Sequence, residues 1–223
     1  MKIVINTYYK NTIALNHLLE SMQQCEEYNN YEIIVISGGF YNLDNYEIKK
    51  NNNLTMITCN HNSIDFTGLI TLLELFHENE DDYYFYMHDT CKVGNNFYKK
   101  LKSINLSNVS SIRIYKGDSM NIGVYSQKII NTFKDFLLSK KNTDEKRCAE
   151  FKVNSAEDHI FKNDSNNIVL DNFEGSYIID GPCNYYSSGV MRRVEYYPNI
   201  DIYKFKANYG QLGWDINCMI LNA

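Results

Sequence analysis

The segment Ile33-Ile34-Val35-Ile36-Ser37-Gly38-Gly39 joins a β-branched run to a turn signal. Four consecutive apolar residues indicate a strand that is buried on both faces, and the Ser-Gly-Gly sequence ends it. Comparable short apolar runs occupy residues 2–5, 54–58 and 83–87. Two segments beginning near Thr12 and Ser63 carry apolar residues at steps of three and four, which is typical of helices. Buried strands separated by helices predict an α/β fold with a mostly parallel central sheet covered by helices on both faces.

Length and composition narrow the class of protein. The 223 residues suit a single domain of two lobes, and 14% aromatic residues exclude a disordered chain. The 22 basic and 27 acidic side chains give a net charge of −5 that is spread along the chain, so we expect no nucleic-acid partner. No apolar run approaches the roughly 20 residues of a membrane span, and the N-terminus lacks a secretory pattern. We therefore expect a soluble, cytoplasmic protein whose six cysteines are reduced thiols.

The chain is expected to form one domain of two halves, residues 1–92 and 93–223. The second half is more mixed in its patterns. Ser111–Tyr115 is strand-like, Met120–Tyr125 leads into a helix, and Ser155–Asp158 opens a short helix. No internal repeat and no linker-like stretch marks a boundary.

Polar residues follow each strand of the first half at the point where it ends. These are Thr7-Tyr8, Ser37-Gly38-Gly39, Asn60 to Asn62, and His88-Asp89. Open parallel sheets bind ligands outside the carboxyl ends of their strands, so the pattern predicts a small-molecule site. The turn after the first strand has no glycine, and the chain has neither a P-loop nor a GxSxG motif. These absences argue against dinucleotide-binding, P-loop and α/β-hydrolase classes.

The motifs at these strand ends resemble those of the GT-A glycosyltransferases, nucleotide-sugar-dependent enzymes of the family-2 type. The matching residues are Asn6-Thr7-Tyr8, Ser37-Gly38-Gly39, His88-Asp89-Thr90 and Glu157-Asp158. The chain is also similar to the small glycosyltransferase domains encoded by large DNA viruses, which would place it in the host cytoplasm. The resemblance implies a GT-A-like fold in which residues 1–92 bind the nucleotide and residues 93–223 the acceptor.

The resemblance also implies an activity: transfer of a sugar from a nucleotide-sugar donor, a UDP-sugar by default, to a hydroxyl of a glycan or glycoprotein. Asp158, with Glu157 beside it, would act as general base, and direct displacement would invert the anomeric centre. Asn121 and Gly123 match the acceptor-side segment. The expected nucleotide-binding residues are Thr7, Tyr8, Ser37, Gly38, Asn62, Asp65 and His88.

A divalent cation is implied at the end of the fourth strand, where Asp89 would hold Mn²⁺ or Mg²⁺ on the diphosphate. One carboxylate can suffice, because phosphate oxygens and water complete the coordination shell. His88-Asp89-Thr90 lacks one carboxylate of the family's usual Asp-x-Asp pattern. If His88 ligates the ion, Mn²⁺ is favoured over Mg²⁺.

Structural alternatives remain open at several of these positions. Asp89 can be a turn residue after a strand, and Ser37-Gly38-Gly39 a tight turn. Ser155-Ala156-Glu157-Asp158 matches a capping box, so Asp158 can close a helix N-terminus. Asp65 can complement a helix dipole. Two other functions also stay open: a sugar-phosphate nucleotidyltransferase, although no glycine-rich basic segment follows the first strand, and a non-catalytic nucleotide- or sugar-binding domain.

Overall fold

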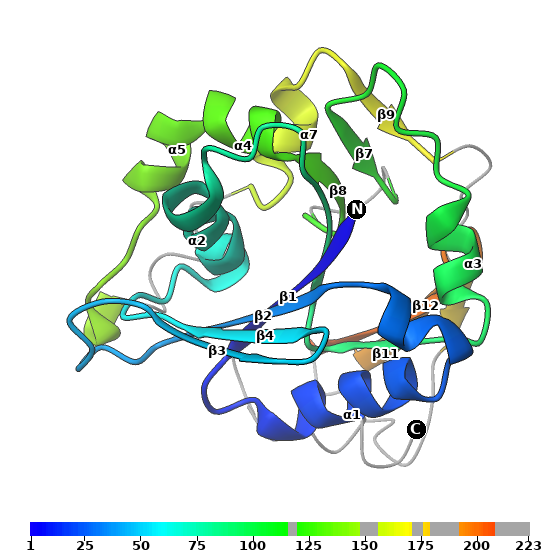
Figure 1. Cartoon of the computed structure of the whole chain (residues 1–223), viewed down its shortest axis with the longest axis horizontal. Coiled ribbons are helices and arrows are strands. Elements are labelled where there is room, and N and C mark those ends of the chain that lie inside the picture. The colour runs from blue at the N-terminus through cyan, green and yellow to red at the C-terminus, as the bar shows by residue number, and fades with distance from the viewer. Residues whose placement is uncertain (116–119, 148–155, 171–175, 179–191, 208–223) are drawn as a thin grey trace. The chain divides into compact units, whose positions relative to one another are not determined.

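The computed structural model describes residues 1–115, 120–147, 156–170, 176–178 and 192–207 (Figure 1). The chain divides into two compact units whose segments alternate along the sequence. The first unit comprises Met1–Lys10, Asn29–His88 and Leu106–Leu170, and the second comprises Asn11–Tyr28, Asp89–Asn105 and Asp171–Ala223. The bounds of these units differ from those of the two functional halves, residues 1–92 and 93–223, expected from the sequence. The division into a nucleotide-binding half and an acceptor half stays a prediction.

Within the described residues, the first unit holds a sheet of eight strands in the order β3-β4-β2-β1-β5-β8-β7-β9. Its centre runs parallel: β4 (Leu54–Thr58), β2 (Ile33–Gly38), β1 (Lys2–Tyr8) and β5 (Tyr83–His88). These are the strands that the apolar runs predict, and β2 is buried at every position. A mixed α/β fold with a large, mostly parallel central sheet flanked by helices is thus confirmed.

The outer strands of this sheet do not all run parallel to the four central strands. The edge strand β3 (Glu47–Asn51) and the strand β8 (Gly123–Ser126) are antiparallel to their neighbours. Beyond β8 lie β7 (Ser111–Arg113) and β9 (Asn167–Val169), which pair in parallel. All five residues of β3 are exposed, and Ile48 is 55% exposed, so hydrophobic periodicity does not predict this strand. Met120–Tyr125 does lead into a helix, but only after Gly123–Ser126 has formed β8.

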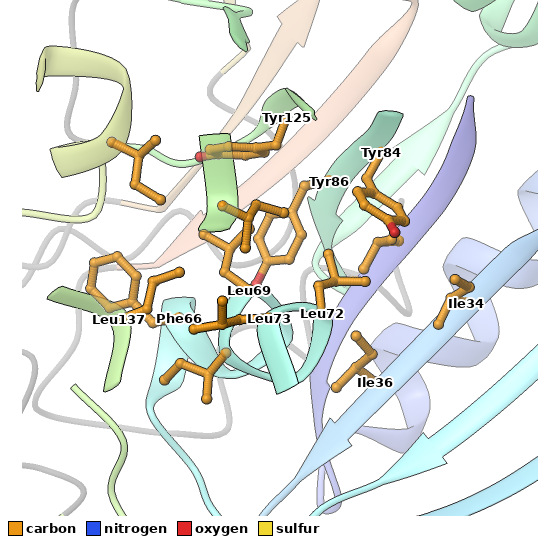
Figure 2. Close-up of a cluster of buried hydrophobic side chains, with 14 of the residues drawn as sticks. Ile34, Ile36, Phe66, Leu69, Leu72, Leu73, Tyr84, Tyr86, Tyr125 and Leu137 are labelled. Atoms are coloured by element: carbon orange, nitrogen blue, oxygen red, sulfur yellow. The ribbon is translucent and has the colours of Figure 1, made fainter. Parts of the chain in front are cut away.

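Helices cover one face of this sheet. Helix α2 (Thr67–Phe76) packs against β1 and β2, and α4 (Gln127–Thr132) and α5 (Lys134–Ser139) lie beside it (Figure 1). Figure 2 shows Leu69, Leu72 and Leu73 of α2 among side chains of β2 and β5. The remaining short elements are η1 (Glu26–Asn30), η2 (Ile64–Phe66), η3 (Glu145–Arg147) and α7 (His159–Asn163).

The second unit is built around an antiparallel sheet. In the part of the chain that the structure describes, the strand order is β10 (Ser176–Ile178), β11 (Arg192–Tyr197), β12 (Ile202–Ala207) and β6 (Cys91–Val93). Helix α1 (Thr12–Gln23) packs on β6, where the amide of Val93 donates to Ser21 Oγ at 3.1 Å. Helix α3 (Phe97–Lys102) follows β6.

The structure can be compared with two expectations from the sequence, that the cysteines are reduced thiols and that no segment spans a membrane. Cys25, Cys59 and Cys91 are buried free thiols, as the sequence predicts; the other three cysteines lie outside the described residues. None of the helices in the described ranges combines the length and apolar character needed to cross a bilayer.

Candidate functional site

The carboxyl ends of the parallel strands meet at one edge of the first unit's sheet. The strand register places Thr7 of β1 opposite Ser37 of β2, and Tyr8 opposite Gly38. On the other side of β1, His88 ends β5. Thr7, Ser37 and His88 are buried, and Tyr8 is half-buried. The structure therefore brings together, at one edge, residues that lie far apart in the sequence and that we expect to bind the nucleotide.

Asn6 joins this edge to the start of α2. Its Nδ2 donates to the Ile64 carbonyl at 2.9 Å, and its Oδ1 accepts from the Gly68 amide at 2.9 Å. Asn62 Oδ1 accepts from the Ile64 amide at 3.0 Å. Ile64 has a φ of +53°, a conformation that is strained for a β-branched residue. Side chains of Asn6 and Asn62 thus fix the connection that precedes α2, and protein groups occupy the amides of Ile64 and Gly68.

Asp65, His88 and Asn121 form a buried polar cluster beside this connection. His88 Nε2 lies 2.7 Å from Asn121 Oδ1, and His88 Nδ1 lies 3.6 Å from Asp65 Oδ1. The Asp65 carbonyl accepts from Asn121 Nδ2 at 2.5 Å and from the Tyr86 hydroxyl at 2.9 Å. Two expected nucleotide-binding residues and one expected acceptor residue therefore meet in one hydrogen-bonded group.

The two glycines after β2 are needed by the backbone. A Cβ atom on Gly38 would lie 2.8 Å from both the His61 carbonyl oxygen and the Thr67 methyl group. Gly39 has a φ of +98°, and a Cβ there would lie 2.5 Å from the Tyr8 ring. Side chains at either position would collide with neighbouring groups, which favours the tight-turn alternative for both glycines.

Aromatic rings gather at the ends of β1 and β2. The rings of Tyr8 and Tyr9 are 4.6 Å apart, those of Tyr9 and Phe40 are 5.5 Å apart, and Lys10 Nζ lies 5.1 Å from the Tyr9 ring centre. Burial, together with the hydrogen bond to Tyr9, raises the pKa of Tyr8 to about 12, so this hydroxyl stays protonated at neutral pH. Sequence reasoning selects Tyr8 but misses Tyr9, Lys10 and Phe40, although the run Tyr8-Tyr9-Lys10 after a strand is a visible signal.

Asp158, the expected general base, is a fully buried ion-pair partner. Its Oδ2 lies 2.7 Å from Arg113 Nη2 and 3.0 Å from Lys162 Nζ, and its side chain is 0% exposed. Asp158 directly precedes α7 and makes no side-chain bond to a helix amide. The capping-box alternative needs Ser155, which lies outside the described residues. Sequence reasoning misses Arg113, whose signal is a charged residue at the end of a buried strand.

The other expected site residues are placed as follows. Glu157 is half-buried. Asp89 is buried and belongs to the second unit. Gly123 begins β8 with a φ of +155°, and a Cβ there would collide with the Ile112 carbonyl oxygen. Across the described ranges, no three or more His, Cys, Asp or Glu side chains group as metal ligands, so protein ligands alone complete no coordination shell there.

A second polar cluster lies between β4 and α2, around His61 of the strand-end segment Asn60 to Asn62. His61 Nε2 is 3.3 Å from the Tyr46 hydroxyl and 3.5 Å from Thr71 Oγ1. Tyr46 donates to Glu74, whose carboxylate also accepts from Lys141 Nζ at 2.7 Å. Burial and the nearby Lys141 lower the pKa of His61 to about 4, so the ring is neutral at pH 7.

Comparison with known proteins gives structural likeness alone. No protein-family model matches the chain, and no curated protein matches its sequence. A solved structure of the glycosyltransferase GlyE from Streptococcus pneumoniae TIGR4 is similar, with a TM-score of 0.50 and 12% identity. The match covers 76% of this chain and 45% of GlyE. The structure titled as the apo form of GlyE gives a TM-score of 0.48 at the same identity and coverage.

At this identity the likeness to GlyE shows the fold. The chain corresponds to less than half of the GlyE chain. Over that part of GlyE the two chains share a similar fold.

Proposed function

We propose that this chain is a GT-A-type glycosyltransferase domain that moves a sugar from a nucleotide-sugar donor to a hydroxyl of a glycan or glycoprotein. The observation that carries the proposal is the strand register, which gathers Thr7, Ser37 and His88 at the carboxyl edge of a parallel sheet. The fold shared with GlyE, a protein titled as a glycosyltransferase, supports the same class of reaction.

In this proposal the nucleoside binds at the ends of β1 and β2. Thr7 and Ser37 supply hydroxyl groups, and the half-buried Tyr8 ring supplies a face for the base. Asn62 and Asp65 lie in the segment between β4 and α2, and His88 ends β5. No carboxylate stands in Ser37-Gly38-Gly39, so recognition of uracil by an acidic side chain at this position is not part of the proposal. UDP remains the default nucleotide.

The cation of this reaction would be held by Asp89, whose carboxylate oxygen is a donor that Mn²⁺ and Mg²⁺ accept. Asp89 directly follows the last residue of β5, a position consistent with a ligand role. The ion would stabilise negative charge on the departing diphosphate. Thr90 next to it offers a second oxygen, although its hydroxyl already accepts from Lys204 Nζ.

The acceptor hydroxyl must lose a proton, and Glu157 and Asp158 are the carboxylates proposed for it. Asp158 is bound to Arg113 and Lys162, so it accepts a proton only if those ion pairs loosen. Glu157 is half-buried and next to it. Replacing the true base costs about 10²- to 10⁴-fold in rate, whereas replacing its neighbour costs little.

The burial of Asp158 also favours a second candidate, a non-catalytic nucleotide- or sugar-binding domain. A carboxylate that is 0% exposed and held by two cations is a common structural feature. In that case donor binding persists without turnover, and neither Glu157→Gln nor Asp158→Asn alters it.

The test is a panel of nucleoside diphosphates and nucleotide sugars, each with and without Mn²⁺, on the folded chain. A ligand at about 100 times its Kd adds about 2.7 kcal/mol of stability, which a thermal-shift assay detects. We expect one diphosphate series to stabilise the chain, with a dependence on Mn²⁺ that Asp89→Asn removes. The exposed Asp44→Asn is the matched control.

Turnover is measured as release of nucleoside diphosphate from the stabilising sugar nucleotide. Release that falls at least 100-fold in Glu157→Gln or Asp158→Asn, with unchanged donor binding, supports the glycosyltransferase. Binding without release in the presence of varied acceptors supports the binding domain. A cooperatively unfolding chain that no nucleotide stabilises contradicts the glycosyltransferase and favours a domain that binds some other ligand.

A further inference from the structure

We propose that His61 is a proton-operated switch: protonation of its buried ring detaches the segment 141–147 from the rest of the first unit. All the groups involved lie within that unit. The inference goes beyond the proposed function, because the release takes place with or without a nucleotide.

The first argument is that the neutral ring of His61 leaves one buried nitrogen without a partner. Nε2 lies 3.3 Å from the Tyr46 hydroxyl and 3.5 Å from Thr71 Oγ1. Tyr46 donates its hydroxyl proton to Glu74, and Thr71 donates its own to the Thr67 carbonyl at 2.9 Å. Both hydroxyls therefore present lone pairs to Nε2, so Nε2 carries the proton. Nδ1 is then the nitrogen that a second proton must enter, and it is buried with no hydrogen-bond partner among the described residues.

The second argument is the balance of charge around the ring. Lys141 Nζ lies 2.7 Å from Glu74 Oε1, so one cation faces one carboxylate while His61 is neutral. The titratable neighbours Tyr46 and Cys59 stay uncharged, because burial raises the pKa of Tyr46 and raises the pKa of Cys59 to about 11. A second proton on His61 therefore places two cations beside one carboxylate. Burial and then Lys141 oppose that charge and lower the pKa of His61 to about 4, although Glu74 favours it.

The third argument is that polar contacts hold the segment 141–147 in place. Its first residue, Lys141, supplies the ion pair described above. The Asn142 carbonyl accepts from the Asn62 amide at 2.9 Å, and the Asn142 amide donates to Ser63 Oγ at 3.0 Å. All residues of the segment after Asn142 are exposed. A segment with so little buried apolar surface opens locally at a lower cost than the unfolding of the whole chain.

Opening of the segment gives the charge on His61 a partner. Once Lys141 has left, the Glu74 carboxylate balances the protonated ring, and water reaches Nδ1. The pKa of His61 then returns to its ordinary 6.5, so the segment opens more readily as the pH falls from 6.5 towards 4. Because the Asn142 carbonyl leaves the Asn62 amide at the same time, the change reaches the sheet edge that we expect to bind a nucleotide.

The experiment measures hydrogen exchange of the full chain by mass spectrometry at pH 7 and pH 5, corrected for the intrinsic pH dependence of amide exchange. From the two pKa values of His61, we expect peptides that cover 59–63 and 140–147 to open about 20-fold more at pH 5 than at pH 7. Local opening exposes little surface, so their exchange should depend only weakly on added urea. A peptide from β5, which opens through global unfolding, should exchange more slowly and respond steeply to urea.

The decisive variant is His61→Gln, which cannot take up a proton and should abolish the rise at pH 5. The exposed His77→Gln is its matched control and should keep the rise. Lys141→Met should increase exchange in the 140–147 peptide at least fivefold at pH 7 already, whereas the exposed Lys128→Met should not. Thermal unfolding confirms that each variant is folded, and Lys141→Met decides if His61→Gln does not fold.

Three results would overturn the proposal. They are a wild type whose two peptides open equally at both pH values, a folded His61→Gln variant that keeps the rise, and peptides that exchange only together with β5. Unchanged exchange in Lys141→Met would do the same, because the ion pair would then not hold the segment. Since no nucleotide is present, failure of the proposed glycosyltransferase function leaves these results unaffected.

Discussion

At the level of single residues, Asp158 illustrates how two cations can pair with one buried carboxylate and contribute very differently. Arg113 is 10% exposed at its side chain, whereas Lys162 is 55% exposed. Removing one member of a buried ion pair leaves an uncompensated charge, but an exposed lysine is already solvated. We therefore expect loss of the ion pair with Arg113 to lower the free energy of unfolding more than loss of the ion pair with Lys162.

We expect Asp158→Asn to lower the free energy of unfolding by about 3 kcal/mol, because the buried Arg113 guanidinium loses the carboxylate to which it donates at 2.7 Å. Lys162→Ala should cost less than about 1 kcal/mol. Urea denaturation of both variants measures the difference. Equal costs would mean that the pair with Arg113 is not the one that matters for stability.

His61 makes stability depend on pH. Its pKa is lowered from 6.5 to about 4 in the folded chain, chiefly by burial and then by Lys141. Between these values the unfolded chain binds more protons than the folded one, so stability is fully present above pH 6.5 and is lost as the pH falls towards 4. The shift corresponds to about 3 kcal/mol.

Urea denaturation between pH 7 and pH 4 tests this dependence by comparing the wild type with His61→Gln. Carboxylates titrate in the same range, so the informative quantity is the difference between the two curves. We expect the variant to lose about 3 kcal/mol less over this range than the wild type. His77→Gln, at an exposed position, should follow the wild-type curve. Parallel wild-type and His61→Gln curves would contradict the assignment.

At the level of elements, β8 depends on one glycine. Gly123 sits between Tyr86 of β5 and Arg113 of β7 in the strand register, with the Ile112 carbonyl too close to admit a Cβ atom. The Phe161 ring also lies 2.9 Å from that position. Any side chain there must separate β7 from β8.

We therefore expect Gly123→Ala to destabilise the chain by at least about 2 kcal/mol, the cost typical of overpacking plus backbone strain. Lys49→Ala on the exposed strand β3 is the control and should change stability by less than about 0.5 kcal/mol. Chemical denaturation measures both. A neutral Gly123→Ala variant would show that β7 can shift without cost.

Elements with strong apolar patterns could be predicted from the sequence, and weakly patterned ones could not. The buried runs give β1, β2, β4 and β5, and the periodic segments give α1 and α2. Strand β3 is polar and exposed, so it has no hydrophobic pattern. Strand β8 has only four residues and directly precedes a helix, so its sequence can equally be interpreted as the turn that leads into that helix. Likewise, Asp65, His88 and Asn121 could be selected as polar residues. Their contact could not be foreseen, since it depends on folding across 33 to 56 residues.

At the level of the whole molecule, neither compact unit is a continuous stretch of chain. The sheet of the first unit draws on residues before and after the segment 89–105, and its core includes Tyr125, Leu137 and Phe161 as well as Val4 and Leu69. Six of the 18 buried residues of this core, a third of it, are therefore missing from any fragment that ends near residue 92.

A fragment of residues 1–92 should accordingly fail to unfold cooperatively. It retains β1, β2, β4 and β5 but loses β8, α4, α5 and α7, so the apolar faces of α2 and β5 stay uncovered. Circular dichroism during thermal unfolding tests the fragment against the full chain. A sharp transition in the fragment would show that the nucleotide-binding half expected from the sequence folds alone.

The outer edge of β3 also has a consequence for the behaviour of concentrated solutions. Within the described residues this strand is the last of its sheet and exposes Ile48, features that favour intermolecular strand addition. Lys49 and Lys50 place adjacent positive charges on the same strand, and two copies meeting edge to edge would bring these charges together. Salt screens this repulsion between the lysines, and chemical neutralisation of their ammonium groups removes it. We therefore expect Lys49 and Lys50, which lie outside the core and the candidate sites, to oppose edge-to-edge association of the protein.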